Sequence, residues 1–361
     1  MPRPTHDQDP ASRRGGRPGR SELAGGRGLR LGIMEIYDFI VVGAGPCGIA
    51  VGAAARKDGA SCLLLDKGPL TASILDYPYY MEFFSTARML EIGGVPFTIP
   101  TDKPTRRDAL AYYRFVVEHW EIPVRQYEEV ERITGSHGDF TVHTRTMGGR
   151  ENRYRARAVV VATGGFHEPN FLGVPGEELP KVRHYYKEPY PYFDQDVVVV
   201  GGRNSAVESA LEMYRNGARV TLVHFEEWID DGVKSWVVPD ITNRLKRGEI
   251  ASFFRHRIVE IRPESVLLRH EDTGARTELD NDFVLAMTGW RADPALLRSL
   301  GVTIDEATGI PAHDPASMET DVAGVYIAGV IAAGHDANKI FIENGREHGE
   351  RIVGSRVATP V

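Results

Sequence analysis

Asp38-Phe-Ile-Val-Val-Gly43-Ala-Gly45-Pro-Cys47-Gly48 is the stretch that decides the fold. Its apolar half predicts a buried strand over 38–42, and the glycines follow the pattern Gly-x-Gly-x-x-Gly before an Ala-rich helix over 48–58. In this pattern Gly43 makes a tight turn, Gly45 lets the backbone approach a pyrophosphate, and Gly48 lets the helix pack on the strand. The positive end of the helix binds the phosphates, so the stretch predicts a dinucleotide site.

A second strand, over 62–65, ends in Asp66, 18 positions past Gly48. A carboxylate at this place binds a ribose hydroxyl in dinucleotide-binding folds. The strand, glycine turn, helix and acidic residue together are a far more specific signal than the three glycines alone.

The same layout returns over 196–224. Asp196-Val-Val-Val-Val-Gly-Gly-Arg-Asn-Ser-Ala206 predicts a strand and a glycine turn, followed by an amphipathic helix over 206–216 and a strand over 219–224. Arg203 stands where the second close-approach glycine belongs, so its side chain must point away from a pyrophosphate or bind it. Ala206 is a usual substitute for the third glycine. We therefore expect a second nucleotide site.

This second unit favours NADPH over NADH, because its last strand ends in His224 rather than in an Asp or Glu that would select NADH. Glu226 and Glu227 lie nearby and keep NADH as the alternative. Candidate partners of a 2′-phosphate are the basic residues His224, Arg219, Lys234 and Arg244.

Further segments complete an α/β architecture. Residues 157–165 form an apolar strand that ends in Ala162-Thr163-Gly164, and residues 283–290 repeat this layout after the second nucleotide unit. Residues 324–329 supply a last strand and a glycine turn before a closing helix over 343–352. The predicted fold has two doubly wound, three-layer (ββα) Rossmann-like domains.

Length and composition narrow the function. At about 100–200 residues per domain, 361 residues suggest two domains. The net charge of −7 disfavours nucleic acid and anionic membranes as partners, and no apolar run reaches the length of a membrane span. Cys47 and Cys62 are the two cysteines, which excludes a disulfide framework, a Cys-x-x-Cys redox pair and a cysteine-built zinc site. We expect a cytoplasmic protein without a metal.

The first 33 residues differ from the rest. They carry seven Arg against three acidic residues, are rich in Gly and Pro, and hold almost no large apolar side chains. Such a composition cannot bury enough surface to order itself, so we expect a disordered tail before a natural start at Met34. A targeting segment or an anion-binding arm is the alternative.

The order of these motifs resembles the flavoprotein disulfide reductases with two dinucleotide domains, and within them the YpdA-type bacillithiol disulfide reductases. The resemblance covers nearly all of 36–354. It rests on Gly43-Ala-Gly-Pro-Cys-Gly48, Phe83-Phe-Ser-Thr86, Leu90-Glu-Ile-Gly93, Lys103-Pro-Thr-Arg106 with Tyr112-Tyr-Arg114, Gly201-Gly-Arg-Asn-Ser-Ala206 and Ile331-Ala-Ala-Gly-His-Asp-Ala-Asn-Lys-Ile-Phe-Ile-Glu-Asn-Gly-Arg346.

The resemblance implies an enzyme that contains FAD and uses NADPH to reduce the disulfide of bacillithiol, a low-molecular-weight bacterial thiol. FAD would occupy a discontinuous domain, 34–174 and 287–361, into which an NAD(P)H domain, 175–286, is inserted. Related reductases are commonly dimers, so we expect a homodimer or higher homo-oligomer. The residues expected to bind FAD are Gly43, Gly45, Pro46, Gly48, Asp66, Lys67, Thr163, Gly164 and Gly329. Those expected to bind NADPH are Gly201, Gly202, Asn204, Ser205, Ala206 and His224.

The chain departs from the thioredoxin reductase pattern in two ways. That family carries a Cys-x-x-Cys pair in its NADPH domain, whereas this chain has no cysteine after Cys62, so substrate reduction cannot use an internal dithiol. The family's C-terminal turn ends in Gly-Asp, whose carboxylate binds the flavin ribityl chain, but here Gly329 is followed by Val330. We expect the ribityl contact to come from the backbone or from Asp336.

Cys47 is the candidate catalytic residue. It lies in the first turn of the helix after the glycine turn, where the helix dipole lowers the pKa of a thiol and favours attack on a disulfide. The cysteine at this place is also the proposed active-site residue of the family that the chain resembles. The competing interpretation is a buried residue near the FAD phosphates. Cys62 lies in an apolar strand, and we expect it in the core.

Two aromatic stretches are candidates for packing on flavin or lining a substrate cleft, with ordinary core and linker packing as the alternative. They comprise Tyr77, Tyr79, Tyr80, Phe83 and Phe84, and then Tyr185, Tyr186, Tyr190, Tyr192 and Phe193. Four prolines predict a hinge between the domains, namely Pro175, Pro180, Pro189 and Pro191. A polar group could bind substrate, donate a proton or form a helix entry: His335, Asp336, Asn338 and Lys339.

Three other functions stay open. A flavin monooxygenase is disfavoured because its Phe-x-Gly-x-x-x-His signature fails at Phe171-Leu-Gly173, which continues to Glu177 where His belongs. A reductase of the ferredoxin–NADP type also lacks the Cys-x-x-Cys pair and passes electrons to a protein. A non-enzymatic redox sensor would change a partner interaction on binding FAD or NADPH and would leave Cys47 silent.

Overall fold

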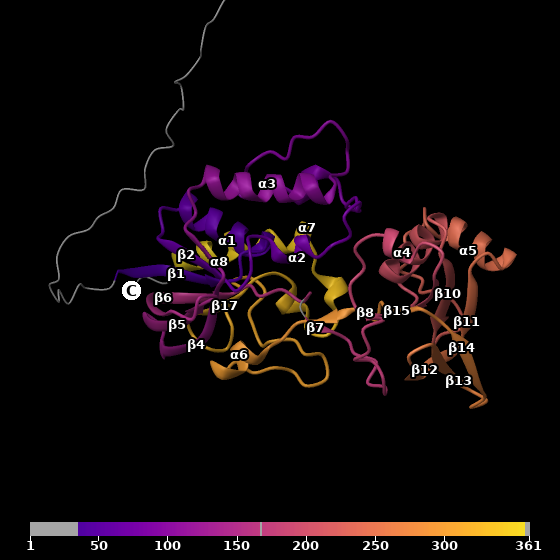
Figure 1. Cartoon of the computed structure of the whole chain (residues 1–361). Helices are drawn as coiled ribbons and strands as arrows, with labels where there is room; N and C mark the ends of the chain where they lie inside the picture. The colour runs from indigo at the N-terminus through magenta and orange to yellow at the C-terminus, as the bar shows by residue number, and fades with distance from the viewer. Residues whose placement is uncertain (1–34, 167, 358–361) are drawn as a thin grey trace, which may run out of the picture. The chain divides into compact units, whose positions relative to one another are not determined.

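The computed structural model describes residues 35–166 and 168–357, and Figure 1 shows their helices and strands. The tail predicted over 1–33 and the start at Met34 lie outside these residues. Within the described part of the chain, no helix is long and apolar enough to cross a membrane.

The first lobe is built on a seven-stranded sheet. Its parallel strands are β1 (Ile36–Val42), β2 (Cys62–Asp66), β3 (Val124–Gln126), β6 (Glu151–Val161) and β17 (Val325–Ile327), and a hairpin of β4 (Glu128–Ser136) and β5 (Asp139–Thr146) extends it. Val42 pairs with Leu65 on one side and with Val161 on the other, and Val161 also pairs with Ile327. The carboxyl ends of four strands therefore meet at one edge, where ligands bind in open α/β sheets.

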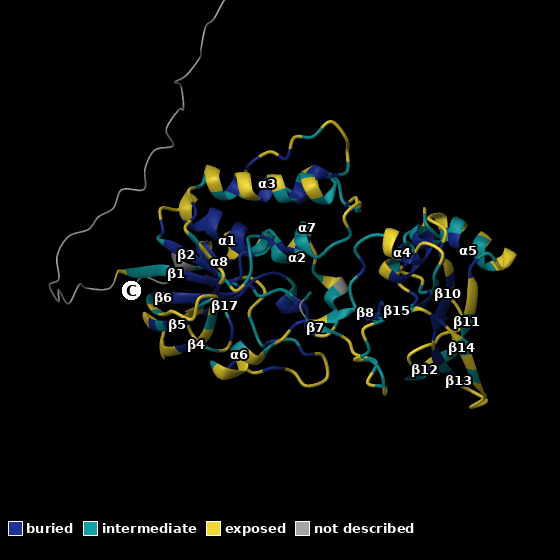
Figure 2. Cartoon of the chain, viewed as in Figure 1, coloured by how far each residue is buried: buried dark blue, intermediate teal, exposed yellow. Residues whose placement is uncertain are grey.

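Helix α1 (Pro46–Lys57) lies at the centre of this lobe, with every residue from Gly48 to Ala55 buried (Figure 2). It starts two residues before the expected position because Pro46 is a favourable first helical residue. α1 is covered by α3 (Arg106–His119) and α8 (His348–Val357). The expected single closing helix over 343–352 is wrong, since α7 (Ile342–Gly345) ends at a glycine before α8 begins.

The second lobe holds a five-stranded parallel sheet in the order β11-β10-β9-β15-β8. Its strands are β8 (Val182–Arg183), β9 (Asp196–Val200), β10 (Arg219–His224), β11 (Ala251–Phe254) and β15 (Phe283–Ala286), with helices α4 (Asn204–Arg215) and α5 (Val238–Arg247). All of these elements fall between β6 and β17 of the first lobe, so the second nucleotide unit is an insertion in the first. The predicted α/β class with two parallel nucleotide-type sheets is confirmed.

Between the lobes the chain passes twice through a short antiparallel pair, β7 (Glu168–Pro169) and β16 (Trp290–Arg291). The remaining helices are short: α2 (Ala72–Leu75), α6 (Ala295–Ser299), and the 3₁₀ turns η1 (Ala87–Leu90), η2 (Tyr190–Tyr192), η3 (Gly329–Ala333) and η4 (Ala337–Lys339).

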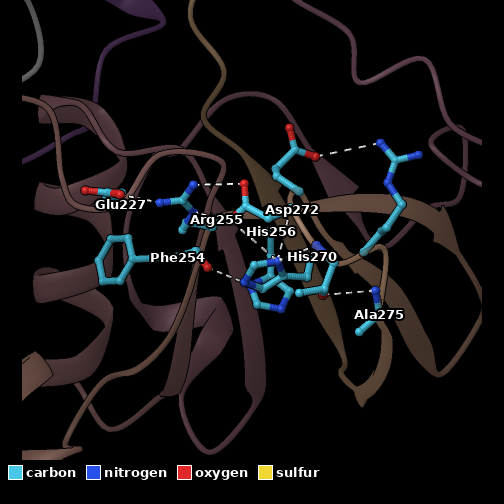
Figure 3. Close-up of polar contacts among 10 residues, drawn as sticks. Glu227, Phe254, Arg255, His256, His270, Asp272 and Ala275 are labelled. Carbon is cyan, nitrogen blue, oxygen red and sulfur yellow. Dashed lines mark hydrogen bonds and ion pairs between the residues drawn. The ribbon is translucent and has the colours of Figure 1, made fainter.

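A separate antiparallel sheet, β12 (His256–Ile261), β13 (Ser265–His270) and β14 (Arg276–Asp280), joins the second lobe at Arg255. Arg255 has φ 56° and donates its backbone N–H to the carbonyl of Glu226. Figure 3 shows its guanidinium between Glu227 and Asp272, with His256 hydrogen-bonded to the carbonyl of Phe254. We interpret this partly buried cluster as a structural joint.

Candidate functional site

The carboxyl ends of the first sheet open on a cavity of about 960 Å³, close to the upper end of the range of small-molecule sites. Both sequence fingerprints contribute to its wall. From the first lobe come Gly43, Gly45, Pro46, Cys47, Asp66, Thr163, Gly164 and Gly329, and from the second lobe Asn204, Ser205, Glu208 and Glu212.

The first glycine turn has the geometry of a dinucleotide cradle. Gly43 has φ 113°, and a Cβ there would lie 2.3 Å from the carbonyl oxygen of Ala162. A Cβ on Gly48 would lie 2.0 Å from the oxygen of Gly43, so α1 packs directly on the turn. Gly45 instead faces open space, with no heavy atom within 4 Å of its would-be Cβ. The turn thus leaves room for a pyrophosphate at the N-terminus of α1.

Two polar side chains beside this turn can still form hydrogen bonds to a ligand. The carboxylate of Asp66 accepts the N–H groups of Ala44 at 2.7 Å and Gly68 at 2.8 Å, and Asp66 lines the cavity with lone pairs to spare. The hydroxyl of Thr163 is buried without a hydrogen-bond partner among the described residues. A buried polar atom of this kind normally has a partner, which a bound dinucleotide would supply. Lys67 does not line the cavity.

Cys47 lies in a tight niche on the cavity wall. A Cβ on Gly329 would lie 2.9 Å from its Sγ, and one on Gly345 would lie 2.8 Å from it. Burial raises the pKa of the Cys47 thiol to about 12. The expectation of a lowered pKa is therefore wrong, because desolvation of the thiolate outweighs the helix dipole. Cys62 is buried, as expected, and its thiol lies 3.8 Å from the carbonyl of Gly52.

His348 is a residue of this site that the sequence analysis missed. Its Nδ1 accepts the backbone N–H of Gly329 at 3.1 Å, which fixes the glycine turn that contacts Cys47. The imidazole is buried, and desolvation together with the nearby charges of Arg351 and His313 lowers its pKa to about 4. A histidine at the first position of a helix gives no sequence signal for this contact.

The last glycine turn differs from the ribityl-binding pattern, as the sequence indicates. The Val330 side chain lines the cavity, whereas Asp336 does not and lies 4.0 Å from Lys339. His335 packs on Gly309, away from the cavity, and Lys339 is also absent from its wall. A carboxylate does reach the cavity here, since Glu343 lines it and accepts a hydrogen bond from Ser85.

The second glycine turn is closed by a histidine ring. Gly201 has φ 136°, and a Cβ on Gly202 would lie 2.4 Å from Nε2 of His224. His224 is buried, and burial lowers its pKa. The exposed Arg203 points away to Asp230, to which its Nε donates at 3.0 Å. Arg203 therefore takes the first of the two orientations expected from the sequence, with its side chain pointing away from the turn.

Of the four candidate 2′-phosphate partners, one lies at the far end of its strand and another is already paired with carboxylates. Arg219 opens β10, at the opposite end from the glycine turn, and forms ion pairs with Asp194 and Asp196. Arg244 is held by Asp240 and Glu249. Lys234 does line the cavity, and its backbone N–H donates to Oδ1 of Asn204 at 2.9 Å.

The aromatic stretches divide between the cavity and the surrounding structure. Most members of the first line the cavity, as do two members of the second: Tyr77, Tyr80, Phe83, Phe84, Tyr185 and Tyr186. Tyr192 belongs to the core of the second lobe, while Tyr190 and Phe193 are exposed. The second stretch is thus mainly linker and core packing.

Comparison with known proteins gives three findings. The family model described as pyridine nucleotide-disulphide oxidoreductase matches residues 40–329. Bacilliredoxin reductase Bdr of Bacillus subtilis (strain 168) is 42% identical over 314 residues, which is 87% of this chain and 95% of that protein. The solved structures of bacillithiol disulfide reductase Bdr (YpdA) from Bacillus cereus and Staphylococcus aureus superpose with TM-scores of 0.87 and 0.84. Their identities are 42% and 38%, and each comparison covers 90% of this chain and 99% of the other.

Proposed function

Because the chain belongs to the pyridine nucleotide-disulphide oxidoreductases, we propose that it reduces a low-molecular-weight thiol disulfide, bacillithiol disulfide first among them. The observation that carries this proposal is the 42% identity to Bdr over 87% of the chain. The overall reaction is RSSR + NADPH + H⁺ → 2 RSH + NADP⁺. It takes place in the cytoplasm, where nicotinamide nucleotides and free thiols occur, in a protein that we propose to be a homodimer or higher homo-oligomer.

FAD is proposed in the first lobe, where the glycine cradle, the spare lone pairs of Asp66 and the unpartnered Thr163 hydroxyl fit a dinucleotide. When bound, FAD accepts two electrons from a nicotinamide and passes them on to a disulfide. The protein's part is to hold the pyrophosphate on the Gly43–Gly48 turn and the ribose on Asp66. Pro46, Lys67, Gly164 and Gly329 complete the proposed FAD residues.

NADPH is proposed on the second lobe, and the domain boundaries 34–174, 175–286 and 287–361 are proposed with it. Its pyrophosphate would lie on the turn and at the first helical residues of α4, that is, on Gly201, Gly202, Asn204, Ser205 and Ala206. β10 ends in His224 rather than in an acidic residue, and this supports NADPH rather than NADH.

Cys47 is proposed as the nucleophile. Its Sγ would attack one sulfur of the disulfide, forming a mixed disulfide as the original S–S bond breaks, and its proton would go to the departing thiolate. Two electrons and two protons, supplied overall by NADPH and one proton from solvent, then release the second thiol and restore the Cys47 thiol. The raised pKa of Cys47 opposes the first step, so a purely packing role is the direct competitor.

The Cys47→Ala variant separates these roles, with Cys62→Ala as the matched control. Both variants should bind flavin, and NADPH should bleach it in both under nitrogen. Disulfide turnover should be lost in Cys47→Ala and kept in Cys62→Ala. Equal turnover of all three proteins would show that Cys47 only packs.

A protein acceptor is the second candidate, because the Bacillus subtilis relative is named for bacilliredoxin rather than for the small disulfide. Comparing oxidised bacilliredoxin with bacillithiol disulfide at equal concentration decides between them. The ferredoxin–NADP reductase, monooxygenase and sensor alternatives have less support, since the relatives that cover most of the chain at 38–42% identity are named as reductases of bacillithiol disulfide or bacilliredoxin.

A further inference from the structure

Four side chains form a compact group on the cavity wall, which we call the cation–aromatic cluster: Phe84, Lys103, Lys234 and Trp236. The rings of Phe84 and Trp236 meet edge to face with centroids 6.0 Å apart. Lys103 Nζ lies 4.3 Å from the centroid of the Trp236 ring, and Lys234 Nζ lies 4.9 Å from that of Phe84. Each lysine therefore covers an aromatic ring of the other lobe, and all four residues line the cavity.

The backbone holds both lysines in place. Hydrogen bonds from Phe83 to Pro104 and from Ala87 to Asp102 fix the segment around Lys103. Lys234 is fixed by its N–H bond to Oδ1 of Asn204 at the start of α4. Both side chains are partly buried, so their ammonium groups have lost some of their water.

Neither ammonium has a carboxylate within 4.0 Å among the described residues, unlike the nearby Arg215, which pairs with Asp240 at 2.5 Å. An ammonium carries three donors, and contact with a ring face leaves them free for an anion. Two partly desolvated cations without an anionic partner therefore converge on one wall of the cavity.

The carboxylate that interacts electrostatically with Lys234 competes only weakly with an incoming anion. Glu208 interacts electrostatically with Lys234, but burial and the neighbouring Glu212 raise the pKa of Glu208 to about 7. Near neutral pH it therefore carries only part of a negative charge. A bound anion would supply the negatively charged partner that the two lysines lack.

We propose that the cation–aromatic cluster is an anion subsite that binds the carboxylate groups of the disulfide substrate, while the two rings contact its apolar parts. This inference rests on the proposed function. A phosphate of NADPH offers the same chemistry, but Lys103 and Phe84 belong to the first lobe, whereas the turn proposed for NADPH lies in the second. The disulfide must enter the cavity that both lobes line, so the geometry favours the disulfide as the occupant.

The test compares Lys103→Gln and Lys234→Gln with the exposed Lys246→Gln as control, after flavin content shows that each variant is folded. The substrates are bacillithiol disulfide and glutathione disulfide, which carry carboxylates, and 2-hydroxyethyl disulfide, which is uncharged. Loss of one charge-assisted contact should raise KM for the anionic disulfides about tenfold in either cavity variant. KM for 2-hydroxyethyl disulfide and for NADPH, and all constants of Lys246→Gln, should stay unchanged.

Unchanged KM for the anionic disulfides, or an equal rise for the uncharged one, overturns the subsite. A rise in KM for NADPH alone also overturns it and assigns the lysines to the nucleotide phosphate. If the wild-type protein reduces no disulfide, the proposed function fails. Calorimetric titration of wild type and Lys103→Gln with glutathione disulfide then decides the subsite separately: tighter binding to wild type supports it, and equal or no binding overturns it.

Discussion

The lack of a side chain on Gly345 makes room for the sulfur of Cys47, since a Cβ on Gly345 would lie 2.8 Å from Sγ of Cys47. The two residues are almost 300 positions apart, yet α7 and the first turn of α1 share one niche. Gly329 closes the same niche from the last strand, with its would-be Cβ 2.9 Å from both Cβ and Sγ of Cys47. The position of the thiol is thus set by two glycines.

This relationship predicts a specific rescue. Gly345→Ala should lower the melting temperature by about 3 °C or more, because the new methyl group overlaps Sγ. Adding Cys47→Ala removes Sγ and should recover most of the loss, as a double-mutant cycle measures. Gly329→Ala should not be rescued, since its φ of 77° and its overlap with the Cβ of Cys47 remain. Additive effects of Gly345→Ala and Cys47→Ala would contradict the shared niche.

The raised pKa of Cys47 predicts slow alkylation. With a pKa of about 12, the thiolate fraction at pH 8 is small, so Cys47 should react with iodoacetamide at least about a hundredfold more slowly than free cysteine. The rate should rise about tenfold per pH unit up to pH 10 without a plateau. Mass spectrometry of the Cys62→Ala protein checks this, and a midpoint below pH 9 would disagree with the buried niche.

His348 predicts an acid-sensitive component of stability. Its pKa falls from 6.5 to about 4 on folding, so the unfolded chain binds the proton more readily. The stability from this group is complete above pH 6.5 and is lost as the pH falls toward 4, at most about 3 kcal/mol.

The His348→Asn variant isolates that component, because its amide oxygen can still accept the Gly329 N–H but does not titrate. Between pH 6.5 and 4.5 the wild-type melting temperature should fall more steeply than that of His348→Asn. Parallel curves would mean that His348 does not carry the effect.

The contact between Gly202 and His224 predicts a nucleotide-binding defect. In Gly202→Ala the new Cβ would lie 2.4 Å from Nε2 of the buried His224, so the ring or the turn must move. KM for NADPH should rise about tenfold or more with flavin content unchanged. Gly148→Ala is the control, since the nearest atom to its Cβ is 3.9 Å away. Normal NADPH kinetics in Gly202→Ala would count against this turn as the nucleotide site.

The sequence was sufficient for the nucleotide units because their signals are local. The Asp38–Val42 and Asp196–Val200 runs, their glycine turns and the acidic Asp66 lie within about 30 residues of one another in each unit. The strand position of Arg219 is also readable from the sequence and argues against it as a phosphate partner, since it opens its strand while nucleotides bind at the carboxyl ends.

The niche of Cys47, the imidazole of His348 and the cation–aromatic cluster could not be predicted in this way. Each depends on segments far apart in the chain, such as Gly345 against Cys47 or Lys103 against Trp236. The pKa of Cys47 is the clearest case, because the helix dipole is visible in the sequence and the burial that outweighs it is not.

The proposed disulfide reduction is tested most directly by NADPH consumption by the purified protein under nitrogen, with bacillithiol disulfide added and with glutathione disulfide and cystine as comparisons. We expect flavin that NADPH bleaches and a rate of NADPH oxidation that rises steeply and saturably with bacillithiol disulfide. Bleaching by NADPH without acceleration by any of these disulfides would contradict the proposed reduction of a small disulfide and direct the electrons to a protein acceptor.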